Sequence, residues 1–281
     1  MINQSSDDPL ARAVATGRTL LFAPGDRPER FGKALSSGSD VVVVDLEDGV
    51  PLARKGEART NVLDLLGSGS QVVVRVNDSR TPEGVQDLRA LGSLSGRLVV
   101  MLPKSEDPAQ VQTAIGLLPV GSSVVALIET AVGVINAERI SGTSGVVRLA
   151  FGHLDLCAQL GILPANDVAL SPARFAIVAA SAIHGLPAPV DGVCPEFRDT
   201  DAVRRDARAS LSAGFTAKLC IHPAQVSAVH LAFAPDDDEL AWARMVVQSL
   251  SLDGVAQLNG QMVDRPVLLR AQALLARARP G

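Results

Sequence analysis

Eight short apolar segments, each ending in polar or charged residues, constrain the fold of this 281-residue chain more than any other feature. Most of them are nearly unbroken runs of Val, Ile and Leu, which are typical of parallel strands covered on both faces. Amphipathic helix patterns lie between them, so the sequence predicts repeated strand–helix units. The segments begin at Arg18, Val41, Gln71, Arg97, Ser123, Val146, Ala188 and Ala217, and the seventh is weak.

Eight such units predict an α/β fold, a (β/α)8 TIM barrel, over residues 18–234. An open doubly wound sheet would show the same alternation. However, no G-x-G-x-x-G follows the first segment, and no G-x-x-x-x-G-K-[ST] occurs in the chain. Residues 1–17 are predicted to be a disordered arm, and residues 235–281 a C-terminal helical extension or lid. This extension should hold a helix from Pro235 to about Leu250, a flexible link over 251–260 and a final helix.

The charge and cysteine content exclude several classes of protein. The net charge is −4 and the 26 basic residues are scattered, so no nucleic-acid footprint is present and a small-molecule substrate is expected. Cys157, Cys194 and Cys220 show no C-x-x-C spacing, which favours buried thiols in a reducing cytoplasm over disulfides or zinc ligands. No run approaches the ~18 apolar residues of a membrane span, and no signal peptide is recognisable. A cytoplasmic protein is expected.

Two acidic residues stand directly after neighbouring apolar segments. Glu129 ends SVVALIET and Asp155 ends VVRLAFGHLD, so in a barrel both carboxylates should project into the same mouth. Mg²⁺ is commonly held by one or two carboxylates, with water and substrate oxygens completing its octahedron. The alternative is structural, since either residue could cap a helix or pair with a nearby Arg. The pair together favours a metal site.

Arg75 ends a very apolar segment and needs an anionic partner there. Asp45, Glu47 and Asp48, at the end of the preceding segment, could supply it as a purely structural ion pair. In the functional interpretation, Glu47 or Asp48 orients the guanidinium while its free donors clamp a substrate carboxylate. The sequence leaves both interpretations open.

Other polar residues near the segment ends are weaker candidates. Lys104 either lines the site or is simply solvated, and His153 stands close enough to Asp155 to reach the site. His222, between Ile and Pro, is more simply explained as a partner of a loop carbonyl. The turn from Pro24 to Arg27 resembles an anion seat, although its basic residue could equally be a surface cation.

Seven segments, in this order, resemble the citrate lyase beta subunit-like proteins of the HpcH/HpaI aldolase and malyl-CoA lyase superfamily. The resemblance extends from about Arg18 to Leu275. The segments are RTLLFAPGDRPERFGKAL, VVDLEDGV, VVVRVN, LPKSED, ALIETAVGVINAERI, FGHLDL and GFTAKLCIHPAQV. The superfamily has a TIM barrel with C-terminal helices, which agrees with the segment count.

The resemblance implies roles for particular residues. Glu129 and Asp155 would ligate Mg²⁺, and Arg75 would contact the substrate's carboxylate or developing enolate. Asp264 in QMVDRP would enter the site of a neighbouring subunit and act as an acid. Glu47 would act in catalysis beside Arg75, and four further residues would bind the substrate near the site: Arg18, Asp45, Asp48 and Lys104. The sequence departs from the family pattern at a few positions. His153 and Cys157 stand where the family varies, and Ala217 stands where it often has Gly. These differences affect the expected substrate more than the expected chemistry.

The activity implied is that of a Mg²⁺-dependent carbon–carbon lyase, and the chain is expected to form a homotrimer. It would cleave malyl-, citramalyl- or citryl-CoA into an acyl-CoA and a 2-keto acid. One alternative is an acyl-CoA thioesterase or a free 2-keto acid aldolase on the same scaffold, because metal-activated water could capture the acyl group instead. A third is a citrate lyase-type subunit that works only with an acyl-carrier partner.

Overall fold

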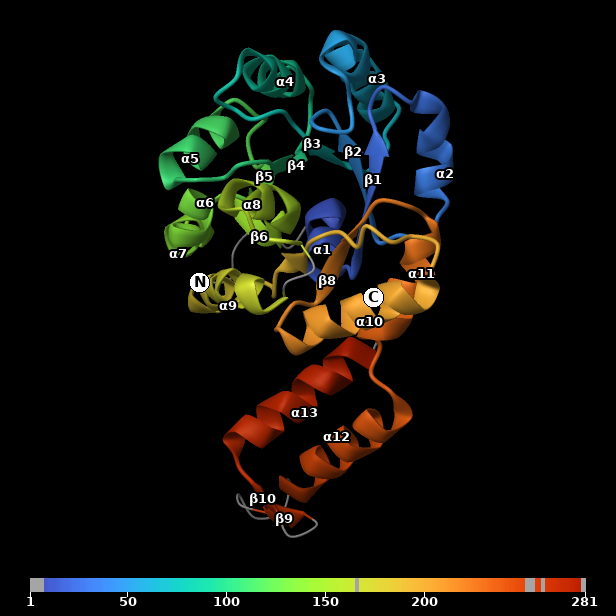
Figure 1. The fold of residues 1–281 in the computed structure, drawn as a ribbon, viewed down its shortest axis with the longest axis vertical. Coiled ribbons are helices and arrows are strands. Elements are labelled where there is room, and N and C mark those ends of the chain that lie inside the picture. Colours follow the sequence, from blue (N-terminus) through green and yellow to red (C-terminus); the bar gives the residue numbers. More distant parts are fainter. Residues whose placement is uncertain (1–7, 165–166, 251–255, 259–260, 279–281) are drawn as a thin grey trace. The chain divides into compact units, whose positions relative to one another are not determined.

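A closed barrel of eight parallel strands forms the first part of the molecule, in the order β1 to β8 around the ring (Figure 1). The structure is a computed structural model that describes residues 8–164, 167–250, 256–258 and 261–278. The predicted TIM barrel is therefore confirmed. The strands are β1 (Thr19–Pro24), β2 (Val41–Asp45), β3 (Val73–Arg75), β4 (Val99–Leu102), β5 (Ser123–Ile128), β6 (Val146–Phe151), β7 (Val190–Asp191) and β8 (Ala217–Cys220).

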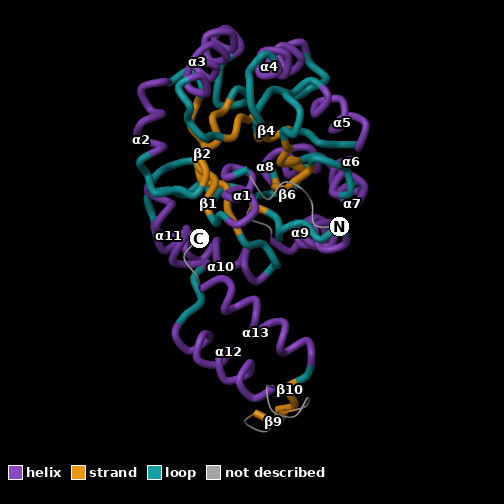
Figure 2. The backbone as a smooth tube through the Cα atoms, turned by 180° about the vertical axis from the view of Figure 1, so that it is seen from behind, coloured by secondary structure: helices purple, strands orange, loops and turns teal. Residues whose placement is uncertain are grey.

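Helices surround the barrel and connect its strands, as Figure 2 shows in purple. Two single-turn 3₁₀ segments, η2 (Pro28–Arg30) and η3 (Leu52–Arg54), precede α2 and α3. The helices of the ring are α2 (Phe31–Leu35), α3 (Lys55–Gly67), α4 (Pro82–Gly92), α5 (Pro108–Gly116), α6 (Ala131–Ile135), α7 (Ala137–Ser141), α8 (His153–Leu160), α9 (Asp167–Ile183), α10 (Thr200–Ser212) and α11 (Ala224–Phe233).

The strands form where the apolar runs predicted them because both of their faces are buried. Every residue of β2, β4, β5, β6 and β8 is buried, which leaves no face for polar alternation. Inward-pointing side chains such as Val43, Met101 and Leu219 fill the barrel interior. Side-chain caps mark the starts of α4, α5, α6 and α10; at α4, Thr81 accepts a hydrogen bond from Gly84 N.

The N-terminal segment corrects one prediction. Residues 9–16 form helix α1 (Pro9–Thr16), not a disordered arm, while residues 1–7 lie outside the described part of the chain. Leu10, Ala11 and Val14 are buried and belong to the same apolar cluster as the barrel interior. The reason is tertiary, because the N-terminal end of the barrel exposes apolar side chains and α1 covers them.

Arg148, on β6, ties α1 to the barrel. Its guanidinium is buried and donates to the carbonyl oxygens of Val14 (2.7 Å), Gly17 (2.8 Å) and Ala188 (2.8 Å), and to Thr216 Oγ1 (2.9 Å). Burial lowers the pKa of Arg148 to about 9, which still leaves the side chain charged at neutral pH. The end of α1 is thus bound by a cation whose donors are matched by backbone acceptors.

The C-terminal part forms a second compact unit. The two units divide between Val229 and His230, inside α11 and a few residues before the predicted boundary at 234. Helices α12 (Asp237–Leu250) and α13 (Arg265–Ala278) agree with the predicted helices. The predicted flexible link is wrong in part, because strands β9 (Ala256–Leu258) and β10 (Gln261–Val263) pair antiparallel, and its residues 251–255 and 259–260 lie outside the described residues.

Two of the sequence-based exclusions can be compared with the structure. All three cysteines are buried as free thiols. Within the described ranges, no helix combines the length and apolar content needed to cross a membrane.

Candidate functional site

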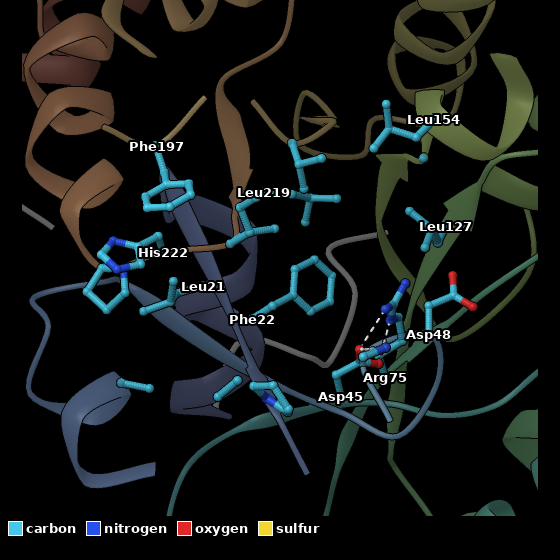
Figure 3. Close-up of a pocket in the computed structure, with 18 of the residues that line it drawn as sticks. Leu21, Phe22, Asp45, Asp48, Arg75, Leu127, Leu154, Phe197, Leu219 and His222 are labelled. Atoms are coloured by element: carbon cyan, nitrogen blue, oxygen red, sulfur yellow. Dashed lines mark hydrogen bonds and ion pairs between the residues drawn. The ribbon is translucent and has the colours of Figure 1, made fainter. Parts of the chain in front are cut away.

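A cavity of about 840 Å³ opens at the C-terminal ends of the barrel strands. Its lining comes from β1, β2, β3, β5 and β8, from η2 and α2, and from the segments that follow β2, β5, β6, β7 and β8. It lies where loops after the strands meet, which is the face expected to carry a site in this fold. Figure 3 shows the cavity, with Asp45, Arg75 and Asp48 grouped together and Phe197 and His222 lying across from them.

Asp45 and Arg75 form a two-point contact in the wall of the cavity. They are direct partners in the parallel register of β2 and β3. Arg75 Nε donates to Asp45 Oδ1 and Nη2 donates to Asp45 Oδ2, both at 2.7 Å, so the pair is bidentate. Asp45 also accepts from the backbone N of Glu47 (2.8 Å) and of Gly49 (2.9 Å). Each of its oxygens therefore accepts two hydrogen bonds, and Asp45 orients the guanidinium. The predicted contact of Asp45 with substrate stays a prediction.

Glu47 also contacts the guanidinium of Arg75, at Nη1. Glu47 Oε2 lies 3.0 Å from Arg75 Nη1, and the guanidinium carbon is 4.7 Å from the centre of the Phe22 ring. Burial alone would lower the pKa of Arg75, but hydrogen bonding and the charges of Asp45 and Glu47 raise it, so the side chain stays charged. Asp45 occupies two of its five N–H groups and Glu47 faces Nη1 as an ion pair, so both Nη atoms keep N–H groups for a ligand.

Lys104 links Glu47 to Glu129. Its ammonium donates to Glu47 Oε1 at 2.7 Å, and its backbone N donates to Glu129 Oε1 at 2.8 Å. The second contact depends on a left-handed backbone at Lys104 (φ 46°), which is uncommon for a residue with a side chain. Neither Glu47 nor Lys104 lines the cavity. Lys104 therefore contacts the carboxylates of Glu47 and Glu129 from outside the cavity lining. Burial raises the pKa of Glu47 despite the nearby Arg75 and Lys104.

Glu129 and Asp155 both line the cavity, one at the end of β5 and the other in the first turn of α8. Glu129 is only 2% exposed, and burial together with the charges of Glu47 and Asp155 raises its pKa to about 8. Gly152 packs so closely that any side chain there would collide with Glu129 Oε2. A buried carboxylate beside two others is the environment that a bound cation would stabilise.

These two carboxylates fit a hard divalent cation. No group of three His, Cys, Asp or Glu side chains suited to hold a metal occurs among the residues that the structure describes. Mg²⁺ does not need such a cage, because it keeps several waters and is often bound through one or two carboxylates and the substrate. Glu129 and Asp155, which both line the cavity, are the two carboxylates that could bind Mg²⁺ in this way.

The structure brings together Asp45, Asp48, Arg75, Glu129 and Asp155 in the cavity lining, and His153 and His222 join them. Asp48 is exposed at the cavity. Arg18 is not brought there. It immediately precedes β1, where its carbonyl accepts from Lys218 N, so it stands at the N-terminal end of the barrel, opposite the cavity. The predicted substrate contact of Arg18 is therefore not supported.

Asp264 lies in the second unit, at the start of α13. It is exposed, and its carboxylate accepts a hydrogen bond from Val267 N at 3.2 Å, as a helix cap does. Its catalytic role stays a prediction.

Several residues of the cavity were not singled out from the sequence. Phe22 lies against Arg75, and strand alternation within β1 was the signal that could have indicated it. Arg30 and Lys33 line the cavity, whereas Arg27, in the turn expected to seat an anion, does not. Phe197 is stacked on His222 with ring centres 4.8 Å apart, a contact between two loops that no local pattern indicates.

Comparisons with known proteins agree with the predicted family. Residues 18–223 match the family described as HpcH/HpaI aldolase/citrate lyase. A citrate lyase subunit beta-like protein of Mycobacterium tuberculosis is 40% identical over 272 residues, which cover 94% of this chain and 96% of that protein. An L-malyl-CoA/beta-methylmalyl-CoA lyase of Cereibacter sphaeroides is 30% identical over 302 residues, covering 93% and 94% of the two chains. The crystal structure of protein CitE from Mycobacterium tuberculosis, in complex with magnesium, acetoacetate and coenzyme A, has a TM-score of 0.83 at 39% identity and covers 94% of this chain and 98% of that one.

Proposed function

Because the chain belongs to the HpcH/HpaI aldolase/citrate lyase family, we propose that it is a Mg²⁺-dependent carbon–carbon lyase acting on a CoA thioester. The substrate would be a 3-hydroxy dicarboxylyl- or tricarboxylyl-CoA of the malyl-, citramalyl- or citryl-CoA type. The observation that carries the proposal is the meeting of two carboxylates, Glu129 and Asp155, with the oriented guanidinium of Arg75 in one cavity. Two relatives support it: one was solved in complex with magnesium and coenzyme A, and another is named as a malyl-CoA lyase.

Glu129 and Asp155 would hold the Mg²⁺, which when bound polarises oxygen atoms of the keto acid half of the substrate. Cleavage breaks the carbon–carbon bond between the hydroxyl-bearing carbon and the carbon next to the thioester. The hydroxyl carbon becomes the carbonyl of a 2-keto acid as its hydroxyl gives up a proton to solvent water. The bonding electron pair stays on the acyl thioester as an enolate, which then takes up a proton.

Arg75 would oppose the negative charge that develops in this reaction. Asp45 holds two of its N–H groups and Glu47 lies against a third, so the guanidinium is oriented before substrate binds. A preorganised cation of this kind stabilises a developing oxyanion without having to rearrange. The remaining N–H groups on Nη1 and Nη2 would bind the carboxylate or the enolate oxygen.

The proton for the enolate would come from Asp264. We propose that the chain forms a homotrimer in which the segment around Asp264 of one subunit closes over the cavity of its neighbour. The support for this role is the resemblance of QMVDRP to the family segment that carries such an acid.

The activity can be tested with purified protein, Mg²⁺ and a panel of malyl-, citramalyl- and citryl-CoA. A lyase releases a 2-keto acid, detected as its hydrazone, while the thioester stays intact. A thioesterase releases free thiol and no keto acid. Activity that appears only with an acylated carrier protein would identify a carrier-dependent subunit, and a chain that releases neither product from any of these substrates would contradict the proposal.

A further inference from the structure

The cavity has two chemically different sides (Figure 3). Asp45, Asp48 and Arg75 lie together on one side. The other side is apolar and aromatic, with the stacked Phe197 and His222 as its largest members. Leu21, Val193, Leu219 and Ile221 extend this apolar surface. A ligand with a charged head and a long, less polar arm can place its head at the charged side and its arm along the apolar side.

The apolar wall is built from two loops that follow different strands. Val193 and Phe197 come from the segment between β7 and α10, and Ile221 and His222 from the segment between β8 and α11. Neither loop belongs to a helix or strand at these positions, so its conformation must be fixed by other contacts. The ring contact between Phe197 and His222 requires the two loops to keep fixed positions relative to each other.

Gln225, on α11, provides the link between the loops. Its Oε1 accepts from Ile221 N at 2.8 Å and from His222 N at 3.2 Å. Its Nε2 donates to Cys194 O at 2.8 Å and to Glu196 O at 3.1 Å. The residue is 1% exposed, so water cannot replace these contacts without rearrangement.

Only a side-chain amide of this length satisfies the pattern. One loop presents two N–H donors and the other presents two carbonyl acceptors, and the Gln amide supplies the matching oxygen and NH₂ group. A Glu side chain would keep the acceptor but set a carboxylate oxygen against two carbonyls. A Met side chain of similar size would leave all four backbone groups without this partner, and a buried backbone group that loses its hydrogen bond is destabilising.

We infer that Gln225 is a positioning residue whose buried amide joins the loops after β7 and β8 and holds Phe197 and His222 as the wall that contacts the thioester arm of the substrate. This inference rests on the proposed function for the identity of the arm. It assigns substrate binding, and not the chemical step, to a residue that lies outside the charged side of the cavity.

The test compares Gln225→Glu and Gln225→Met with the wild-type protein. The matched control is Gln86→Glu, an exposed Gln on α4 that makes the same change of charge away from the cavity. Circular dichroism and thermal unfolding establish that each variant is folded. Coenzyme A is the binding probe, measured by calorimetry, and oxaloacetate with Mg²⁺ is the probe of the charged side. The third measurement is steady-state kinetics on the active thioester.

Both Gln225 variants should weaken coenzyme A binding and raise KM for the thioester by about 10-fold or more, with kcat and the affinity for oxaloacetate within about 3-fold of wild type. Hydrogen exchange should increase in residues 192–199 and 221–223, and Gln86→Glu should behave as wild type. Unchanged coenzyme A affinity and KM in folded variants would overturn the inference, as would an equal loss of kcat. A wild-type protein that binds coenzyme A but cleaves no thioester would contradict only the proposed function, because the affinity comparison still tests Gln225.

Discussion

At the scale of single residues, the orientation of Arg75 is the feature on which the proposed chemistry depends. Arg75→Lys should lower kcat by about 100-fold or more while the protein stays folded, because an ammonium cannot reproduce the bidentate fork on Asp45 and still present two donors. Steady-state kinetics beside thermal unfolding provide the measurement. Arg89→Lys, on the exposed face of α4, is the matched control. Full activity in a folded Arg75→Lys protein would leave only a structural ion pair.

The raised pKa of Glu129 predicts how the stability of the protein depends on pH without added metal. Its pKa is raised from the ordinary value of 4.5 to about 8, so the folded state holds more protons than the unfolded state between these values. The contribution of Glu129 to stability is therefore present below pH 4.5 and is lost as the pH rises toward 8, by up to about 1.4 kcal/mol per pH unit. Urea unfolding from pH 5 to 8 should show a smaller decline in Glu129→Gln than in wild type.

Two comparisons can contradict this assignment. A decline of the same slope in Glu129→Gln and in wild type would show that other groups cause it. The same variant should also bind Mg²⁺ more weakly in the presence of oxaloacetate, because it loses one anionic ligand. Wild-type Mg²⁺ affinity in calorimetry would remove Glu129 from the metal site.

At the scale of elements, α1 stabilises the barrel from the end opposite the cavity. Arg148→Met should lower the free energy of unfolding by roughly 3 kcal/mol or more, since the carbonyls of Val14, Gly17 and Ala188 lose their buried donor. Chemical denaturation measures the loss, and hydrogen exchange should rise first in α1. The kcat should stay near wild type. Arg139→Met, exposed on α7, controls for the loss of a charge, and a variant as stable as this control would refute the role of Arg148.

At the scale of the whole molecule, the proposed trimer places the acid of one chain over the cavity of another. Asp264→Ala and Arg75→Ala should each be inactive alone. When the two are co-expressed, about a quarter of the sites would combine an intact barrel with an intact Asp264 in a cyclic assembly with random mixing. Kinetics on mixed oligomers, verified by mass spectrometry, give the measurement. Mixed oligomers with only background activity would show that Asp264 does not act across a subunit boundary.

The sequence by itself determined the barrel, its strand positions, the family and the face that carries the candidate site. These follow from local information, because buried parallel strands require continuous apolar runs and the polar residues at their ends must gather at one mouth. Glu129, Asp155 and Arg75 could be chosen on this basis. The family predicted from short motifs is confirmed by the match over residues 18–223.

Other features were decided only by the tertiary structure, because they depend on residues far apart in the chain. Three acids end the apolar segment that precedes the one of Arg75, and the register of β2 against β3 selected Asp45 for the bidentate contact. A polar-looking N-terminus became helix α1 because the open end of the barrel provided an apolar surface to cover. Gln225 gained its four contacts from two loops that meet only once the barrel has closed. The local sequence pattern indicates which residues are buried or polar. The partner of each polar group depends on which distant segments the fold brings together.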